Sequence, residues 1–161
     1  MHRREFIAGF AAIAALSGCK STPTVSSDVT PGANFAAYQS FAFVNVVAPA
    51  GMDPVAFERI QQDVGTALTG KGYSPGAPGD MSIVLTLGAK DRTDVQTWGR
   101  FGGQVSVYQY TEGKLAVDVF DTKTRQPLWH GQATETIHPE NPDPAAINTA
   151  VASVMASFPT R

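Results

Sequence analysis

The side chains best suited to acid–base or metal chemistry are two histidines and two aspartates in the C-terminal third of the chain. His130 and His138 are eight residues apart in one predicted strand. That spacing is about 26 Å at 3.3 Å per residue, so the two rings cannot share a metal ion within the strand. Asp118 and Asp121 have opposite parity, which points them to opposite faces and argues against a paired-carboxylate site. These patterns predict no catalytic centre, no metal site and no cofactor.

A glycine-rich segment at residues 98–103 is the most unusual part of the sequence. Trp98 and Phe101 offer flat apolar surfaces and Arg100 a planar cation, beside glycines that let a backbone approach a ligand closely. The segment lacks the Gly-Lys-Ser/Thr of a phosphate loop and precedes a predicted strand. We expect Trp98, Arg100 and Phe101 to contact a partner in the form of an envelope protein, lipid or peptidoglycan. The alternative is a hairpin connection whose aromatic rings cap the edge of the core.

The N-terminus has the features of an export signal. Arg3 and Arg4 precede an apolar run over residues 6–16, which is too short to cross a bilayer as a helix. The sequence Leu-Ser-Gly-Cys that ends at Cys19 resembles the lipobox of bacterial lipoproteins, which implies cleavage before Cys19 and lipid attachment to its sulfur. The alternative is an ordinary signal peptide with Cys19 as a chance neighbour of the cleavage site.

The residues around this signal also bear on export and location. Arg3 and Arg4 with the following Glu-Phe-Ile resemble a twin-arginine signal, so the Sec and twin-arginine routes both stay open. Lys20 stands where lipoproteins retained at the inner membrane carry Asp, which favours the periplasmic face of the outer membrane. Two or three acyl chains on Cys19 would make the anchor effectively permanent.

Length and charge limit what the mature chain does. Cleavage before Cys19 leaves 143 residues of formal charge −3, enough for one domain. This mild acidity, without any run of Lys or Arg, argues against a nucleic-acid partner. A single cysteine excludes a disulfide framework. We expect a signal peptide at 1–18, a lipidated and flexible tether at 19–32, and a single periplasmic domain at 33–161.

Two helices with clear boundaries are predicted in this domain. Asp53 and Asp143 are N-cap residues, each followed by Pro at the first helical position. Gly72 ends the first helix in a left-handed conformation, and Pro159 stops the second. The apolar positions between these boundaries fall on one face of each helix.

Apolar alternation and turn residues predict about five strands. Residues 112–113 (Glu-Gly) are assigned to a turn, and the predicted strands cover 41–47, 81–89, 105–107, 115–119 and 128–137. Short polar connections between the last four strands favour antiparallel pairing. The expected fold is α+β, with element order β-α-β-β-β-β-α: one antiparallel sheet of about five strands with both helices on one face.

Several segments together resemble the domain-of-unknown-function family 4136 of bacterial envelope lipoproteins. They are residues 35–38 (Phe-Ala-Ala-Tyr) leading into 41–43 (Phe-Ala-Phe), Gly72-Tyr73 at the end of the first helix, residues 114–121, the Leu-Trp-x-Gly sequence within 127–133, and Phe158-Pro159. The resemblance implies a small lipidated envelope protein without an assigned reaction. His130 stands where the family leads us to expect Arg or another polar residue, which argues against a shared catalytic imidazole.

These observations predict a non-enzymatic, lipid-anchored envelope protein that acts through binding or assembly. The first alternative is an accessory lipoprotein of a lipid or solute transport system, with an apolar cleft between helices and sheet. A hydrolase acting on cell-wall material is the second. A deep polar cleft would favour the enzyme, a deep apolar cleft the carrier, and a flat or filled surface the assembly role.

Overall fold

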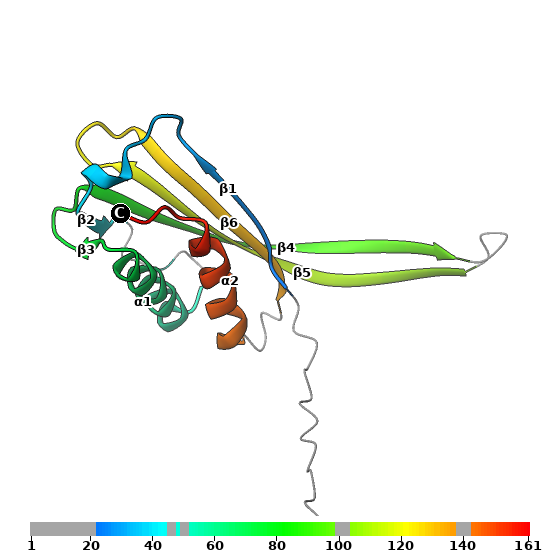
Figure 1. Cartoon of the computed structure of the whole chain (residues 1–161). Helices are drawn as coiled ribbons and strands as arrows, with labels where there is room; N and C mark the ends of the chain where they lie inside the picture. The colour runs from blue at the N-terminus through cyan, green and yellow to red at the C-terminus, as the bar shows by residue number, and fades with distance from the viewer. Residues whose placement is uncertain (1–21, 45–47, 49–51, 99–103, 138–142) are drawn as a thin grey trace, which may run out of the picture.

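The computed structural model describes residues 22–44, 48, 52–98, 104–137 and 143–161. Two helices lie side by side on one face of an open sheet (Figure 1). In chain order the elements are β1 (Thr24–Val29), the 3-10 turn η1 (Phe35–Ala37), β2 (Ser40–Phe43), α1 (Pro54–Gly70), β3 (Ser74–Pro75), β4 (Met81–Trp98), β5 (Gln104–Asp121), β6 (Pro127–Ile137) and α2 (Pro144–Ala156).

The sheet has six strands in the order β1-β6-β5-β4-β2-β3. Strands β1, β6, β5 and β4 pair antiparallel, whereas β2 pairs parallel with both β4 and β3. The predicted α+β class with both helices on one face is therefore confirmed. The prediction of about five antiparallel strands is only roughly right, because α1 forms a crossover that returns the chain parallel to β2.

The first difference from the sequence-based expectation is β1. Residues 24–29 fall within the predicted tether at 19–32, yet all six pair with β6, from Thr24 opposite Thr134 to Val29 opposite Trp129. Every residue of β1 is exposed. This strand is held by its backbone ladder rather than by buried side chains, so its sequence carries little of the apolar pattern that reveals a strand.

The second difference is the length of β5. The predicted turn at residues 112–113 does not exist, because β5 runs without a break through both residues and pairs with β4 along its whole length. Gly113 has another role: a Cβ atom at this position would lie 2.7 Å from Cγ2 of Ile137. The glycine makes room for a side chain of β6. The strand predicted at 41–47 is shorter than expected, and residues 45–47 lie outside the described part.

Both helix starts match the prediction. The Asp53 carboxylate accepts a hydrogen bond from the N–H of Val55 at 3.0 Å, and that of Asp143 accepts one from the N–H of Ala145 at 2.8 Å. Gly72 has φ +95° and follows the end of α1, as predicted. Local capping chemistry therefore sets the boundaries of both helices.

Replacing Asp53 or Asp143 with Ala should each lower the free energy of unfolding by about 1 kcal/mol, because one N–H of the first turn loses its acceptor. Chemical denaturation measures the change. The matched variants Asp53→Asn and Asp143→Asn keep a capping oxygen and should stay close to the unaltered protein. If Asn is as damaging as Ala at these positions, capping is not what the carboxylates contribute.

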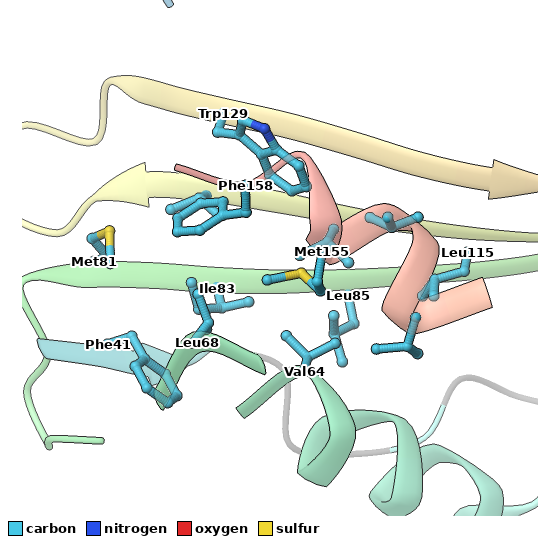
Figure 2. Packing of buried hydrophobic residues seen from close by; sticks show 14 of the residues in the cluster. Phe41, Val64, Leu68, Met81, Ile83, Leu85, Leu115, Trp129, Met155 and Phe158 are labelled. Atoms are coloured by element: carbon cyan, nitrogen blue, oxygen red, sulfur yellow. The ribbon is translucent and has the colours of Figure 1, made fainter. Parts of the chain in front are cut away.

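The core fills the space between the helices and the sheet, as Figure 2 shows. Phe158 lies at its centre, with edge-on ring contacts to Phe35 at 5.4 Å, Tyr73 at 5.7 Å and Trp129 at 5.0 Å between centroids. The rest of the core consists of fully buried side chains from α1, α2 and the strands, among them Val64, Leu68, Ile83, Val117 and Val154. Among the described residues, packed side chains thus occupy the space between the helices and the central strands.

Candidate functional site

β4 and β5 extend far beyond the rest of the sheet as a two-stranded arm (Figure 1). We define the arm as residues 89–98 and 104–113, which pair from Ala89 opposite Gly113 to Trp98 opposite Gln104. β2 stops at Phe43, level with Ile83, and β6 stops at Ile137, level with Thr111. Beyond these points the two strands of the arm pair only with each other in the part of the chain that the structure describes.

The arm carries apolar side chains that are open to solvent. Val95 and Val107 lie directly opposite each other on the side of the sheet that bears the helices, and they are 61% and 58% exposed. Tyr108, on the other side, is 55% exposed. An isolated two-stranded ribbon is marginally stable in water. An arm with exposed valines at its centre is therefore suited to contact another surface.

Polar contacts stiffen the base of the arm. Arg92 donates to the Glu112 carboxylate at 2.8 Å, and the hydroxyl of Thr111 donates to Asp91 at 2.8 Å. Glu112 raises the pKa of Arg92 above its ordinary value, through the hydrogen bond first and its charge second. Desolvation of the phenol, followed by the charge of Asp94, raises the pKa of Tyr110.

A shallow hollow of about 390 Å³ lies beside these residues, where the arm leaves the body. Its walls are hydroxyl and carboxylate groups, including those of Thr24, Asp94, Tyr110, Glu112 and Thr136. An open, acidic hollow suits water and polar groups. It does not suit an apolar cargo.

The open face of the sheet, opposite the helices, brings together two residues that we considered separately in the sequence. Asp118 lies opposite His130 across β5 and β6, and Asp118 Oδ1 is 2.6 Å from His130 Nδ1. On the other side of β6, Asp28 of β1 lies opposite His130. The carboxylate orients the imidazole, but Asp118 is the one hydrogen-bonding partner of the His130 ring within the described ranges. The row of side chains formed by Asp28, His130 and Asp118 contains no hydroxyl or thiol nucleophile within hydrogen-bonding distance of the imidazole.

Asp121 organises the turn that follows β5. Its carboxylate accepts from the N–H groups of Thr124 at 2.7 Å and Lys123 at 2.8 Å, and from the hydroxyl of Tyr38 at 3.0 Å. These bonds, led by that from Thr124, hold the pKa of Asp121 below its usual value. Asp118 and Asp121 do not form a paired-carboxylate site.

The predicted site residues are placed only in part. Trp98 is the last residue of β4, paired with Gln104 at the far end of the arm. Cys19, Arg100, Phe101 and His138 lie outside the described residues. Lipid attachment at Cys19 and partner contact through Trp98, Arg100 and Phe101 therefore stay predictions.

Comparison with known families decides the classification of the chain. Residues 25–160 match the sequence model of the domain of unknown function DUF4136. The chain belongs to the DUF4136 family. A DUF4136 domain therefore includes the arm, both helices and nearly all of β1. A search of curated proteins gives no match.

Solved structures share the fold of this DUF4136 chain at low sequence identity. A PelC dodecamer from Paraburkholderia phytofirmans, in a single-residue variant, superposes with a TM-score of 0.57 at 12% identity, covering 87% of this chain and 99% of that one. A PDZ domain protein from Parabacteroides distasonis gives a TM-score of 0.55 at 15% identity over 88% of this chain. The match spans 37% of the length of that second protein. At such identities the likeness concerns the fold alone.

Among the described residues, no helix combines the length and the apolar character needed to cross a bilayer.

Proposed function

We propose that this DUF4136 protein is a lipid-anchored component of the cell envelope that works by binding or assembly, without catalysis. Cys19 is the anchor, and the periplasmic face of the outer membrane is the location. The β4–β5 arm is the element that makes the contact. The tip of the arm includes Trp98, the first of the three residues singled out for partner contact.

The observation that carries this proposal is the arm itself. Its two strands form a ribbon that projects from the domain beyond the end of β6, and the ribbon exposes Val95 and Val107 directly opposite each other. Exposed apolar side chains on a projecting ribbon are costly in water and favourable in an interface. A contact function accounts for both the length of the ribbon and its composition.

The filled core favours assembly over the carrier alternative. A carrier needs an apolar cleft between helices and sheet, but that space is occupied by the rings around Phe158 and the aliphatic side chains packed on them. The hollow that borders the arm is polar and shallow. The similar PelC structure is described as a dodecamer, which is a further reason to test assembly in this chain.

The anchor is tested by Cys19→Ser. Because we assign membrane attachment to this residue alone, the variant should appear in the soluble periplasmic fraction or accumulate as uncleaved precursor. Cell fractionation and the mass of the N-terminal peptide measure both outcomes. A correctly processed variant that stays with the outer membrane contradicts the assignment.

The contact role of the arm is tested by charging its apolar pair. Val95→Lys/Val107→Lys should abolish the crosslinked species that the protein forms in intact cells, while its melting temperature stays nearly unchanged. The matched control is Val44→Lys/Val55→Lys, which charges two valines that are 62% exposed outside the arm. Equal crosslinking in the two double variants overturns the proposed role of the arm.

A further inference from the structure

Several strand edges in the described part of this chain have no strand beside them, among them the edges of β1 and β4. β1 is an outer strand of the sheet and pairs with β6 on one side only. β4 pairs with β2 only at residues 81–83, so its edge is open along the arm, where residues 89–96 are all exposed. Open edges of this length present rows of free N–H and C=O groups to any strand that fits them.

The direction of the backbone groups can be followed along both edges. The N–H of Val44 donates to the carbonyl of Ile83, so the peptide groups of Ile83 point away from β5. Because these directions alternate along an unbroken ladder, those of Thr93 and Val95 also point outward. On β1 the N–H of Thr30 points to β6, so the groups of the odd residues, such as Ser27, face the open edge.

We propose that β1 of one copy pairs antiparallel with the arm strand β4 of a second copy, with Val25 opposite Val95 and Asp28 opposite Arg92. This inference rests on the proposed assembly function and identifies the partner as a second copy of the same chain. The pairing joins odd residues to odd residues, which is what the outward peptide groups require. It also continues the sheet with the helices of both copies on the same side.

The side chains match in this register. Val25 and Val95 both lie on the side of the sheet that bears the helices, and they are 37% and 61% exposed in the single chain. On the other side, Asp28 meets Arg92, whose side chain is 44% exposed beside Glu112. A guanidinium has five N–H donors and can serve a second carboxylate. Apolar and opposite-charge pairs across strands each stabilise a sheet.

Neighbouring registers match less well. A shift of two residues in one direction places Asp28 opposite Asp94, a repulsive pair. A shift of two in the other direction gives Asp28 the cation of Lys90, but it places Val95 opposite Pro23, whose ring is buried in its own domain. Of these three registers, only the proposed one gives both a cation opposite Asp28 and an exposed apolar side chain opposite Val95.

The proposed register also keeps the two bodies apart. Within one chain, Thr24 is level with Thr134 of β6, Lys114 of β5 and Gly88 of β4. In the contact it lies opposite Gln96 of the second copy, a stagger of about eight residues or roughly 27 Å. The second body therefore sits beside the arm, clear of β2 and α1. Because the two edges differ, the contact repeats head to tail and produces a ring or a filament.

Cysteine crosslinking in the full-length, membrane-located protein tests the register. Val25→Cys/Val95→Cys, treated with a short bifunctional thiol reagent, should give a ladder of dimers, trimers and larger species on a denaturing gel. The matched control Val29→Cys/Val95→Cys places the same chemistry about 13 Å out of register and should stay monomeric. The unaltered chain, whose one cysteine is Cys19 with its sulfur assigned to the lipid anchor, shows any background.

Several results overturn the inference. One is a monomeric Val25→Cys/Val95→Cys variant, and another is a control that crosslinks equally well. A third is a dimer from Val25→Cys/Val29→Cys, which indicates a two-fold contact between β1 strands instead. If arm-dependent crosslinks persist but contain a different protein, the assembly function stands and the second copy is wrong. If Val95→Lys/Val107→Lys changes no crosslink at all, the proposed function itself fails.

A proline variant gives an independent check. Thr93→Pro removes an N–H that points to the open edge and not to β5, so the ladder within the arm keeps its hydrogen bonds. We expect the crosslinked ladder of Val25→Cys/Val95→Cys to disappear in this background, with little change in melting temperature. An undiminished ladder in a stably folded Thr93→Pro protein shows that this edge is not in the contact.

Discussion

Phe158→Ala is expected to lower the free energy of unfolding by about 3–5 kcal/mol, the range for removing a large ring from a packed core. Phe158 is 2% exposed and follows the last turn of α2. Its ring meets Phe35, Tyr73 and Trp129 edge-on, so it joins η1, the segment after α1 and β6 to the C-terminal end of the fold. Edge-to-face pairs add stabilisation beyond the buried area. Denaturant titration of the full-length protein measures the loss.

The control for this prediction is Phe120→Ala. Phe120 is a half-buried phenylalanine of β5, next to the bulge in its pairing with β6. It is outside the core cluster, so its removal should cost clearly less than that of Phe158. Equal losses would show that the ring contacts of Phe158 contribute nothing special. Because Val107 lies on the arm and is exposed, Val107→Ala should leave stability nearly unchanged.

The helices were predictable because their signals are local. Asp53 and Asp143 cap the residues directly after them, and Gly72 adopts positive φ where the apolar pattern of α1 ends. The first turn of a helix and its capping residue are neighbours in sequence. Such features can be recognised without knowing where the rest of the chain lies.

The predictions from sequence were wrong for strands whose extent depends on the strands they pair with. β1 contains no buried side chain, so its ladder with β6 leaves little trace in its own sequence. The Glu-Gly pair at 112–113 has the composition of a hairpin turn. Here position 113 requires a glycine, because the Ile137 side chain occupies the space that a Cβ atom would take. Turn composition and a cross-strand packing requirement produce the same residue.

The candidate site was predictable only in outline. Alternation correctly separated Asp118 from Asp121, but the pairing of Asp118 with His130 depends on the register across the hairpin. Counting back from the turn organised by Asp121 was the signal that could have found it. The open edges of β1 and β4 depend on where β2 and β6 stop. No local pattern in a single sequence records that length difference.

The last prediction concerns Gly131, in the Leu-Trp-x-Gly sequence that resembles the DUF4136 pattern. Gly131→Ala should lower the free energy of unfolding by about 3 kcal/mol, at the upper end of the usual cost of overpacking a core. A Cβ atom here would overlap Cη2 of Trp129, far inside van der Waals contact. The indole is 2% exposed and packs against Phe158, so it has no free space to enter.

Gly88→Ala is the matched control, because a Cβ atom at Gly88 of β4 meets nothing within 4 Å. Both changes add one methyl group to a strand, so intrinsic strand preference affects them alike, and only Gly131→Ala displaces a ring. Trp129→Leu should cost less in the Gly131→Ala background than alone, since removing the indole also relieves the clash that the added methyl group creates. Denaturation of the four proteins measures this coupling. Strictly additive losses would mean that Gly131 is required for the strand backbone and not for the indole that lies over it.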